Sequence, residues 1–203
     1  MNIQFHTGDL PDHVQFRDSV AIDTETMGLN PLRDRLCVVQ LSAGDGSAHL
    51  VRLPKGQYAA PNLKRLLADP GIIKIFHFAR FDVAVLKHYL QVDTTPIYCT
   101  KIASKLIRTY TDRHGLRDVC KELLNVDISK GQQSSDWGND DLSDAQCKYA
   151  ASDVLHLHAL KSHLDTMLER EGRRELAQAC FDFLPVRAEL DLLGWSETDI
   201  FSH

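Results

Sequence analysis

The chain has 203 residues, of which 43% are hydrophobic and 25% are charged. This length and hydrophobic share suit one packed domain, or one domain with a small extension. The formal net charge of −5 argues against a protein that grips a long duplex, because such proteins present a basic surface to the phosphates. A short substrate or a locally basic channel fits this charge better.

The five cysteines are widely spaced, odd in number and without a Cys-x-x-Cys pair, which favours neither a disulfide framework nor a zinc site. The N-terminus has neither the basic region nor the apolar core of a signal peptide. No apolar run approaches the roughly 18 residues that a membrane span needs. We therefore expect reduced thiols, a cytoplasmic protein and no membrane partner.

The first half of the chain is predicted to form strands joined by turns. Residues 20–25 are an apolar run that ends in charge, and residues 36–42 are rich in β-branched and apolar side chains. Gly44-Asp45-Gly46 is a hairpin signal, after which residues 48–53 return as a third strand. Three antiparallel strands are expected here.

Helices and short strands alternate after that hairpin. Pro61 suits the start of a helix, and residues 72–76 have the apolar character of a buried strand. Residues 81–90 carry apolar side chains at helical spacing. Residues 97–99 suit a short edge strand, and Thr100 is expected to cap the helix that follows.

The second half is predicted to be mainly helical. Gly115 interrupts the helical pattern, and a short helix ends near Leu124. The polar residues 129–141 suit a loop. Ser143 and Gln146 form a capping-box pattern that opens a long helix, expected to run to about residue 171.

The whole pattern indicates a mixed α/β architecture in which helices flank a sheet. We assign residues 1–172 to one domain and residues 173–203 to a helical C-terminal extension, interrupted at Pro185 and Gly194.

Asp23 and Glu25 are the most informative residues of the first strand. They are two positions apart, so both carboxylates point to one face while Thr24 points to the other. Two like charges side by side are costly unless a cation binds them. Gly28 allows a sharp turn just beyond the pair.

Three further candidates lie downstream. Asp82 follows a buried strand at the start of a helix, and Tyr149 and Asp153 are one helical turn apart. If these elements pack together, four carboxylates converge into the all-oxygen site that Mg²⁺ or Mn²⁺ prefers. Two such ions about 3.5–4 Å apart activate water and stabilise the leaving oxygen in phosphodiester hydrolysis.

Each motif alone has an ordinary structural explanation. An acidic pair at a strand end can be a solvated edge, an Asp at a helix start can be an N-cap, and a Tyr–Asp pair can be a surface contact. The functional interpretation rests on their occurrence together and in this order.

The three segments resemble the Exo I, Exo II and Exo III motifs of the DEDD 3′–5′ exonucleases. Tyr149 matches the tyrosine subgroup, which includes ribonuclease D, whereas the histidine subgroup would have His where this chain has Lys148. The resemblance implies a ribonuclease H-like, DnaQ-type exonuclease domain with a mixed sheet flanked by helices. It implies that two divalent cations bind to Asp23, Glu25, Asp82 and Asp153, and that Tyr149 assists the attacking water.

Two departures from ribonuclease D narrow this resemblance. Phe78 stands where Exo II usually has Asn, so any polar role of that Asn is absent. The sequence also has no counterpart of the helical C-terminal domains that ribonuclease D uses on structured RNA, which puts tRNA trimming in doubt.

In both departures the chain resembles the small nanoRNase C family. The shared segments are CTKIASKL, RTYTDRHGL, QQSSDW and FLPVRAELDLLGWSETDIF. This resemblance implies cleavage of dinucleotides and very short RNAs to mononucleotides, and assembly into an octameric ring.

A locally basic segment could hold the substrate. Residues 98–121 contain six Lys or Arg residues against two Asp. Their ordinary explanation is a solvated helix face; the alternative is a phosphate-binding patch. Arg108, Arg113 and His114 lie near the turn between two helices and could cap a 5′-phosphate, which would exclude longer RNA.

Other candidates for substrate contact lie beside the motifs. Leu29 resembles an apolar wedge between the last two bases, with packing of the turn as the alternative. Trp137 could stack on a base or cover the core, and we favour the core. The remaining candidates are Thr24, Met27, His77, Lys130, Gln133 and Ser134.

The C-terminal 20 or so residues are very apolar. They could form a closing helix packed on the same domain or a subunit interface, and the resemblance favours an interface in a homo-oligomer. The sequence thus predicts a metal-dependent 3′–5′ exoribonuclease acting on dinucleotides and very short RNAs. The alternatives are a general ribonuclease D-like exonuclease acting on longer RNA or DNA, and a non-catalytic nucleic-acid-binding module.

Overall fold

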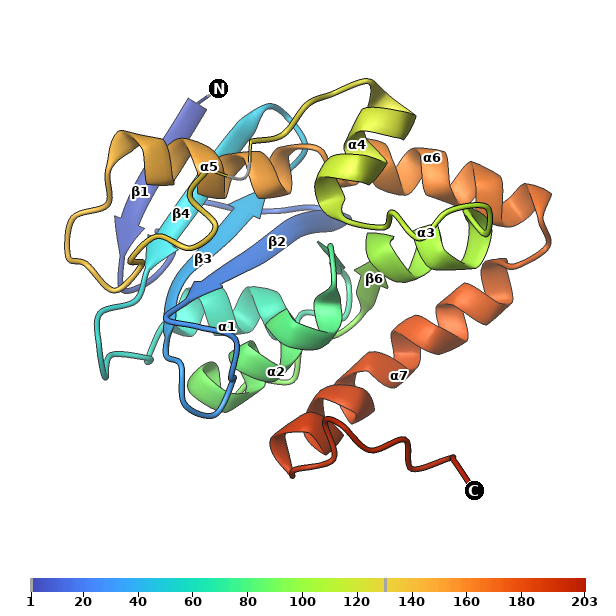
Figure 1. The fold of residues 1–203 in the computed structure, drawn as a ribbon. Helices are drawn as coiled ribbons and strands as arrows, with labels where there is room; N and C mark the ends of the chain where they lie inside the picture. The colour runs from blue at the N-terminus through green and yellow to red at the C-terminus, as the bar shows by residue number, and fades with distance from the viewer. Residues whose placement is uncertain (1, 130) are drawn as a thin grey trace.

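Six strands form one mixed sheet across residues 2–129 and 131–203, which are the residues that the computed structural model describes (Figure 1). They are β1 (Asn2–Thr7), β2 (Ser19–Thr26), β3 (Leu36–Ser42), β4 (Ser47–Arg52), β5 (Ile73–Phe76) and β6 (Ile97–Cys99). The strand order is β1-β4-β3-β2-β5-β6. Strand β3 is antiparallel to β2 and β4, whereas the other neighbouring pairs are parallel.

Helices cover both faces of this sheet. They are α1 (Pro61–Ala68), α2 (Ala79–Leu90), α3 (Thr100–Ile107), α4 (Leu116–Leu124), α5 (Asp144–Leu155), α6 (Leu157–Arg170) and α7 (Arg174–Leu192). Helix α5 packs on β2, β3 and β4, and Figure 1 shows α1 and α2 on the opposite face. Every residue of β3 is buried because both of its faces are covered. The α/β class and the flanked mixed sheet are confirmed.

Most predicted elements are confirmed. The three antiparallel strands are β2, β3 and β4, and the expected helices and strands from Pro61 to Leu124 are present. Strand β1 was not predicted, because its sequence NIQFHT has no apolar run. It is an edge strand that joins the sheet by parallel pairing to β4.

The long helix expected after Ser143 is wrong at one point. It is two helices, α5 and α6, which are separated at His156. The two helices pack against different neighbours: α5 packs on the sheet, whereas α6 packs on α3 and α4. Apolar side chains of both helices are buried, among them Val154 of α5 and Leu160 of α6.

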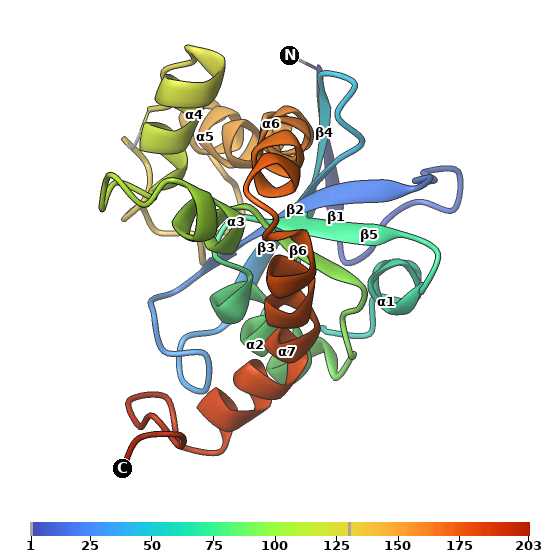
Figure 2. The same cartoon turned by 90° about the vertical axis from the view of Figure 1, so that its right-hand side faces the viewer.

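Helix α7 packs along α2 and β6, and Figure 2 shows it crossing the molecule toward the C-terminus. Its buried side chains, which include Phe181, Leu184 and Ala188, belong to the main core, and the Phe181 ring lies 4.7 Å from that of Tyr98. The helix continues through Pro185. Helix α7 is therefore tied to the same core as the preceding residues.

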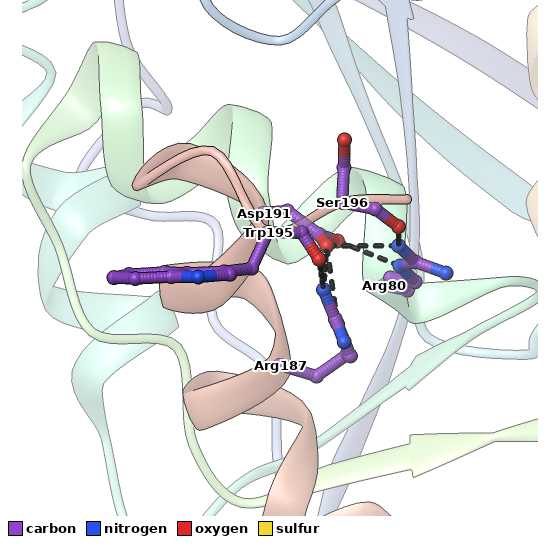
Figure 3. A network of polar contacts seen from close by, with 5 residues as sticks. All are labelled: Arg80, Arg187, Asp191, Trp195 and Ser196. Atoms are coloured by element: carbon purple, nitrogen blue, oxygen red, sulfur yellow. Dashed lines mark hydrogen bonds and ion pairs between the residues drawn. The ribbon is translucent and has the colours of Figure 1, made fainter. Parts of the chain in front are cut away.

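A network of ion pairs fixes the end of α7 (Figure 3). The Asp191 carboxylate accepts hydrogen bonds from Arg80 of α2 at 2.6 and 2.8 Å and from Arg187 at 2.5 and 3.1 Å. The same two guanidinium groups donate to the carbonyl oxygens of Ser196 and Trp195. This network joins α2, α7 and the segment after α7.

Among the described residues, no helix is both long enough and apolar enough to span a membrane.

Candidate active site

Strand β2 presents Asp23 and Glu25 near the middle of the sheet, between β3 and β5. Both side chains are half-buried, as expected for one face of a covered strand. Just beyond them, the chain turns at Gly28, where a Cβ atom would lie only 2.3 Å from the Asp34 carboxylate. The predicted need for glycine in this turn is explained by that close approach.

Helix α5 brings Asp153 to the pair on β2. Ser143 and Gln146 form the predicted capping box at its first turn, which fixes where the helix begins. One oxygen from each of Asp23, Glu25 and Asp153 lies within 4.8 Å of the others. Tyr149 precedes Asp153 by one turn and lines the same cleft. These predicted residues are brought together by the fold.

Asp82 occupies the first turn of α2 and is almost completely buried. Its Oδ1 accepts a hydrogen bond of 2.7 Å from the Thr24 hydroxyl. Asp82 lies outside the group of three but close enough for its charge to act on Glu25. Thr24, predicted to face away from Asp23 and Glu25, thereby orients the fourth carboxylate.

The electrostatics of the site favour a bound cation. Burial raises the pKa of Asp23 to about 7, and burial together with the Asp23 charge raises that of Asp153 to about 8. Burial raises the pKa of Glu25, and the charges of Asp23, Asp153 and Asp82 raise it further. The pKa of Asp82 is also well above its usual range, because of burial and the Asp23 charge. Nearby positive charge would relieve this repulsion.

The donor set fits a hard divalent cation. The three clustered groups offer only carboxylate oxygens, which are the ligands that Mg²⁺ and Mn²⁺ prefer. The residues present therefore fit such an ion.

A cleft of about 660 Å³ opens at the carboxylates. Among the predicted substrate-binding residues, those that line it are Thr24, Met27, Leu29, His77, Gln133 and Ser134. Leu29 is 88% exposed, so the packing alternative does not account for it. Lys130 lies outside the described residues. Trp137 is buried against Tyr149, in agreement with our preference for a core role, and also borders the cleft.

The structure does not place the predicted phosphate cap in the cleft. Arg108 is fully buried, with its guanidinium group donating to Glu122, the Ser104 hydroxyl and the Arg113 carbonyl oxygen. His114 is also buried, with its ring against Ser104. These two side chains hold the turn between α3 and α4, which corrects the expectation that they meet a phosphate. Arg113 is exposed but does not line the cleft.

His77 has a defined role in shaping the cleft wall. Its Nε2 donates to the His114 carbonyl oxygen at 3.0 Å, and its Nδ1 lies 2.8 Å from the Thr100 hydroxyl. Burial and the Lys101 charge lower the pKa of His77 to about 3, so the ring is neutral. The expectation that Thr100 caps α3 is wrong, because its hydroxyl makes no cap hydrogen bond and instead contacts Phe76 and His77.

Sequence reasoning missed several residues around the carboxylates. Lys101 and Arg117 line the cleft and belong to the basic segment of residues 98–121. Phe78 also lines it, with φ 74°, a conformation that Asn adopts more readily than Phe. Gln40 lies beside Asp23 and Glu25, and strand pairing could have revealed it, since it faces Asp23 on β3.

Comparison with known proteins agrees with this geometry. A 3′–5′ exonuclease family profile matches residues 7–169. The chain belongs to that family. Over 154 residues it is 36% identical to ribonuclease D of Granulibacter bethesdensis, covering 76% of this chain and 38% of that protein. The chain thus spans about two fifths of the length of this curated relative.

Two solved structures match over nearly the whole chain. Brucella melitensis NrnC with bound Mg²⁺ is 60% identical, with a TM-score of 0.95 and full coverage of both chains. Brucella melitensis NrnC bound to pGG is 62% identical, with a TM-score of 0.96, covering 100% of this chain and 99% of that one. The resemblance to ribonuclease D and to this smaller group is confirmed, as is the DnaQ-like fold.

Proposed function

We propose that this chain is a cytoplasmic 3′–5′ exoribonuclease that hydrolyses dinucleotides and very short RNAs to nucleoside 5′-monophosphates. The observation that carries this proposal is the group of three carboxylates within 4.8 Å that line the cleft. The likeness to NrnC with pGG bound supports the choice of a short substrate.

Two divalent cations, Mg²⁺ or Mn²⁺, would bind to Asp23, Glu25, Asp82 and Asp153. When bound, they would supply an activated water and offset charge on the scissile phosphate. Asp23, Glu25 and Asp153 provide the clustered oxygens, and the Thr24 hydroxyl holds Asp82 in one orientation.

Tyr149 would orient the attacking water. Burial raises the pKa of its phenol, and the charges of Asp153, Glu25 and Asp23 raise it further. In the metal-free protein the hydroxyl is therefore protonated at neutral pH, and it would donate a hydrogen bond to that water. Its contact with the Trp137 ring, with centroids 6.0 Å apart, restricts its position.

The cleft walls would hold the two nucleotides. Leu29 projects from the turn after β2 and would insert between the bases. Lys101 and Arg117 supply positive charge toward phosphates, and Gln133 and Ser134 supply polar groups. Thr24, Met27 and His77 complete the proposed contacts. A cleft of about 660 Å³ is within the range of sites that enclose one small ligand, which favours short substrates.

The decay of a 2-mer, a 5-mer and a 20-mer RNA, measured in Mg²⁺ or Mn²⁺, tests this proposal. We expect the 2-mer to be consumed fastest, with nucleoside 5′-monophosphates as products. Equal rates on all three lengths would favour a general ribonuclease D-like exonuclease. Binding without hydrolysis would favour a non-catalytic nucleic-acid-binding module. The Asp23→Asn variant is the control for contaminating nucleases.

We further propose that residues 173–203 contribute to a homo-oligomer, in the form of an octameric ring. Large apolar side chains remain exposed on this segment, among them Phe183, Val186, Leu193 and Phe201. Light scattering of Phe183→Asp and Phe201→Asp should show a smaller particle than the unmodified chain. Truncation at Arg174 is a poorer test, because it removes Phe181 and Leu184 from the core.

A further inference from the structure

Gln40 is a fully buried amide on β3 that lies directly across the sheet from Asp23. Its Nε2 is 3.4 Å from Oδ2 of Asp23 and 3.4 Å from Oε1 of Glu25. Because a primary amide nitrogen carries two hydrogens, it can donate one to each carboxylate. Gln40 is therefore placed between the two acidic side chains of β2.

The fold gains little from an amide at this position. Among the described residues, the Gln40 Oε1 is buried without a hydrogen-bond partner. A buried carbonyl oxygen without a donor is unfavourable, so an apolar side chain of similar volume would serve packing at least as well. The adjacent buried residues of β3, such as Val39 and Leu41, are in fact apolar. The amide is explained better by the carboxylates that it contacts.

A neutral donor suits two carboxylates that must also bind a cation. A buried Lys or Arg here would neutralise them and compete with the ion, whereas another acid would add a further negative charge beside them. An amide restrains one oxygen of each carboxylate by hydrogen bonding and adds no charge. The other lone pairs then stay free to face the cleft.

We propose that Gln40 is a positioning residue that aligns Asp23 and Glu25 for cation binding. The inference rests on the proposed function, because it assigns Gln40 a task in the same site. It acts through Asp23 and Glu25, since Gln40 itself does not line the cleft.

The test replaces the amide without changing the volume greatly, in Gln40→Met. We expect kcat on a dinucleotide to fall about 10- to 100-fold and Mn²⁺ affinity to weaken by a similar factor. The KM for the dinucleotide should change little, because Gln40 does not touch the substrate cleft. The melting temperature of the metal-free protein should stay the same or rise.

Ser42→Ala is the matched control on the same strand. Ser42 is also fully buried, and its hydroxyl donates to the Ser47 carbonyl oxygen at 2.7 Å and accepts from the Gly44 N–H at 3.1 Å. This variant should lower the melting temperature and leave kcat and Mn²⁺ affinity unchanged. The two variants thus separate positioning of carboxylates from support of the fold.

Mn²⁺ affinity, measured calorimetrically without substrate, keeps the inference separate from the proposed function. If the unmodified chain binds Mn²⁺ but hydrolyses no RNA, the proposed function fails, and the affinity of Gln40→Met still decides the role of Gln40. Unchanged Mn²⁺ affinity in a folded Gln40→Met protein overturns the inference, whether or not the melting temperature falls. Gln40→Leu serves as the second variant if Gln40→Met does not fold.

Discussion

Two sets of buried carboxylates in this molecule have opposite surroundings. Burial alone would raise the pKa of Asp191, but hydrogen bonds from Arg80 and Arg187 outweigh burial, so this pKa lies below its usual range. Among the described residues, Asp23, Glu25 and Asp153 have no Lys or Arg partner, and their pKa values are raised.

The difference distinguishes a structural carboxylate from one held ready for a ligand. At Asp191 the protein supplies the positive charge itself, and the group contributes to folding. At the cleft the described residues supply no such charge, so under the proposed function a bound cation would have to provide it. Exchange of a carboxylate for its amide should therefore have opposite effects in the two places.

The largest expected effect is in the cleft. Asp23→Asn should abolish metal-dependent RNA hydrolysis, because one of the three clustered oxygens then loses its charge. The same change should stabilise the metal-free protein by about 1 kcal/mol, since it removes a source of repulsion. Dinucleotide turnover and urea unfolding measure the two effects. Hydrolysis that survives this change would remove the carboxylate site from the mechanism.

The next effect is expected at the C-terminal helix. Asp191→Asn should lower the free energy of unfolding by about 2 kcal/mol, because two guanidinium groups lose their counter-charge; partial exposure of Arg80 limits the loss. Turnover by the folded fraction should not change. Urea unfolding at pH 7 checks the first expectation, and unchanged stability would contradict the contrast between the two sites.

The stability of the metal-free protein should fall as the pH rises, because of the carboxylates in the cleft. The raised pKa values of about 7 for Asp23 and about 8 for Asp153 mean that the folded state binds protons more tightly than the unfolded state. Their contribution to stability is full below about pH 4 and is lost as pH rises through about 7 to 8. The melting temperature in EDTA should fall over this range, and Mg²⁺ should offset the fall. Asp23→Asn should flatten the profile.

The smallest effect is expected at an exposed ion pair near Asp191. Lys87 contacts Asp93 at 3.0 Å and Glu189 at 3.2 Å, but both acidic side chains are more than half exposed. Lys87→Ala should change the free energy of unfolding by about 0.5 kcal/mol or less, because water screens the pair. If Lys87→Ala lowers the free energy of unfolding as much as Asp191→Asn does, then exposure does not explain why the Lys87 and Asp191 ion pairs should differ in strength.

Much of the site was visible in the sequence because it depends on local spacing. The i, i+2 spacing of Asp23 and Glu25 and the i, i+4 spacing of Tyr149 and Asp153 fix shared faces on a strand and a helix. The capping box at Ser143 was equally local. Such features follow from backbone geometry without knowledge of the tertiary fold.

The parts that were missed depend on packing between distant segments. Arg108 has the composition of a phosphate ligand, but Glu122 and Ser104 use its donors inside the protein. Gln40 belongs to no recognisable sequence motif, and its proposed role depends on the register that pairs it with Asp23 of β2. Strand β1 depends on pairing with β4 rather than on its own apolar content.

The capping box at the start of α5 also joins the helix to the loop that precedes it. The Gln146 amide donates to the Ser135 hydroxyl at 3.1 Å and to the Asp136 carbonyl oxygen at 3.0 Å, while its oxygen accepts from the Ser143 N–H. The first two bonds hold the loop before α5, and the third belongs to the cap of the helix. The loop around Trp137 and the start of the helix that carries Tyr149 are therefore held in place by one and the same side chain.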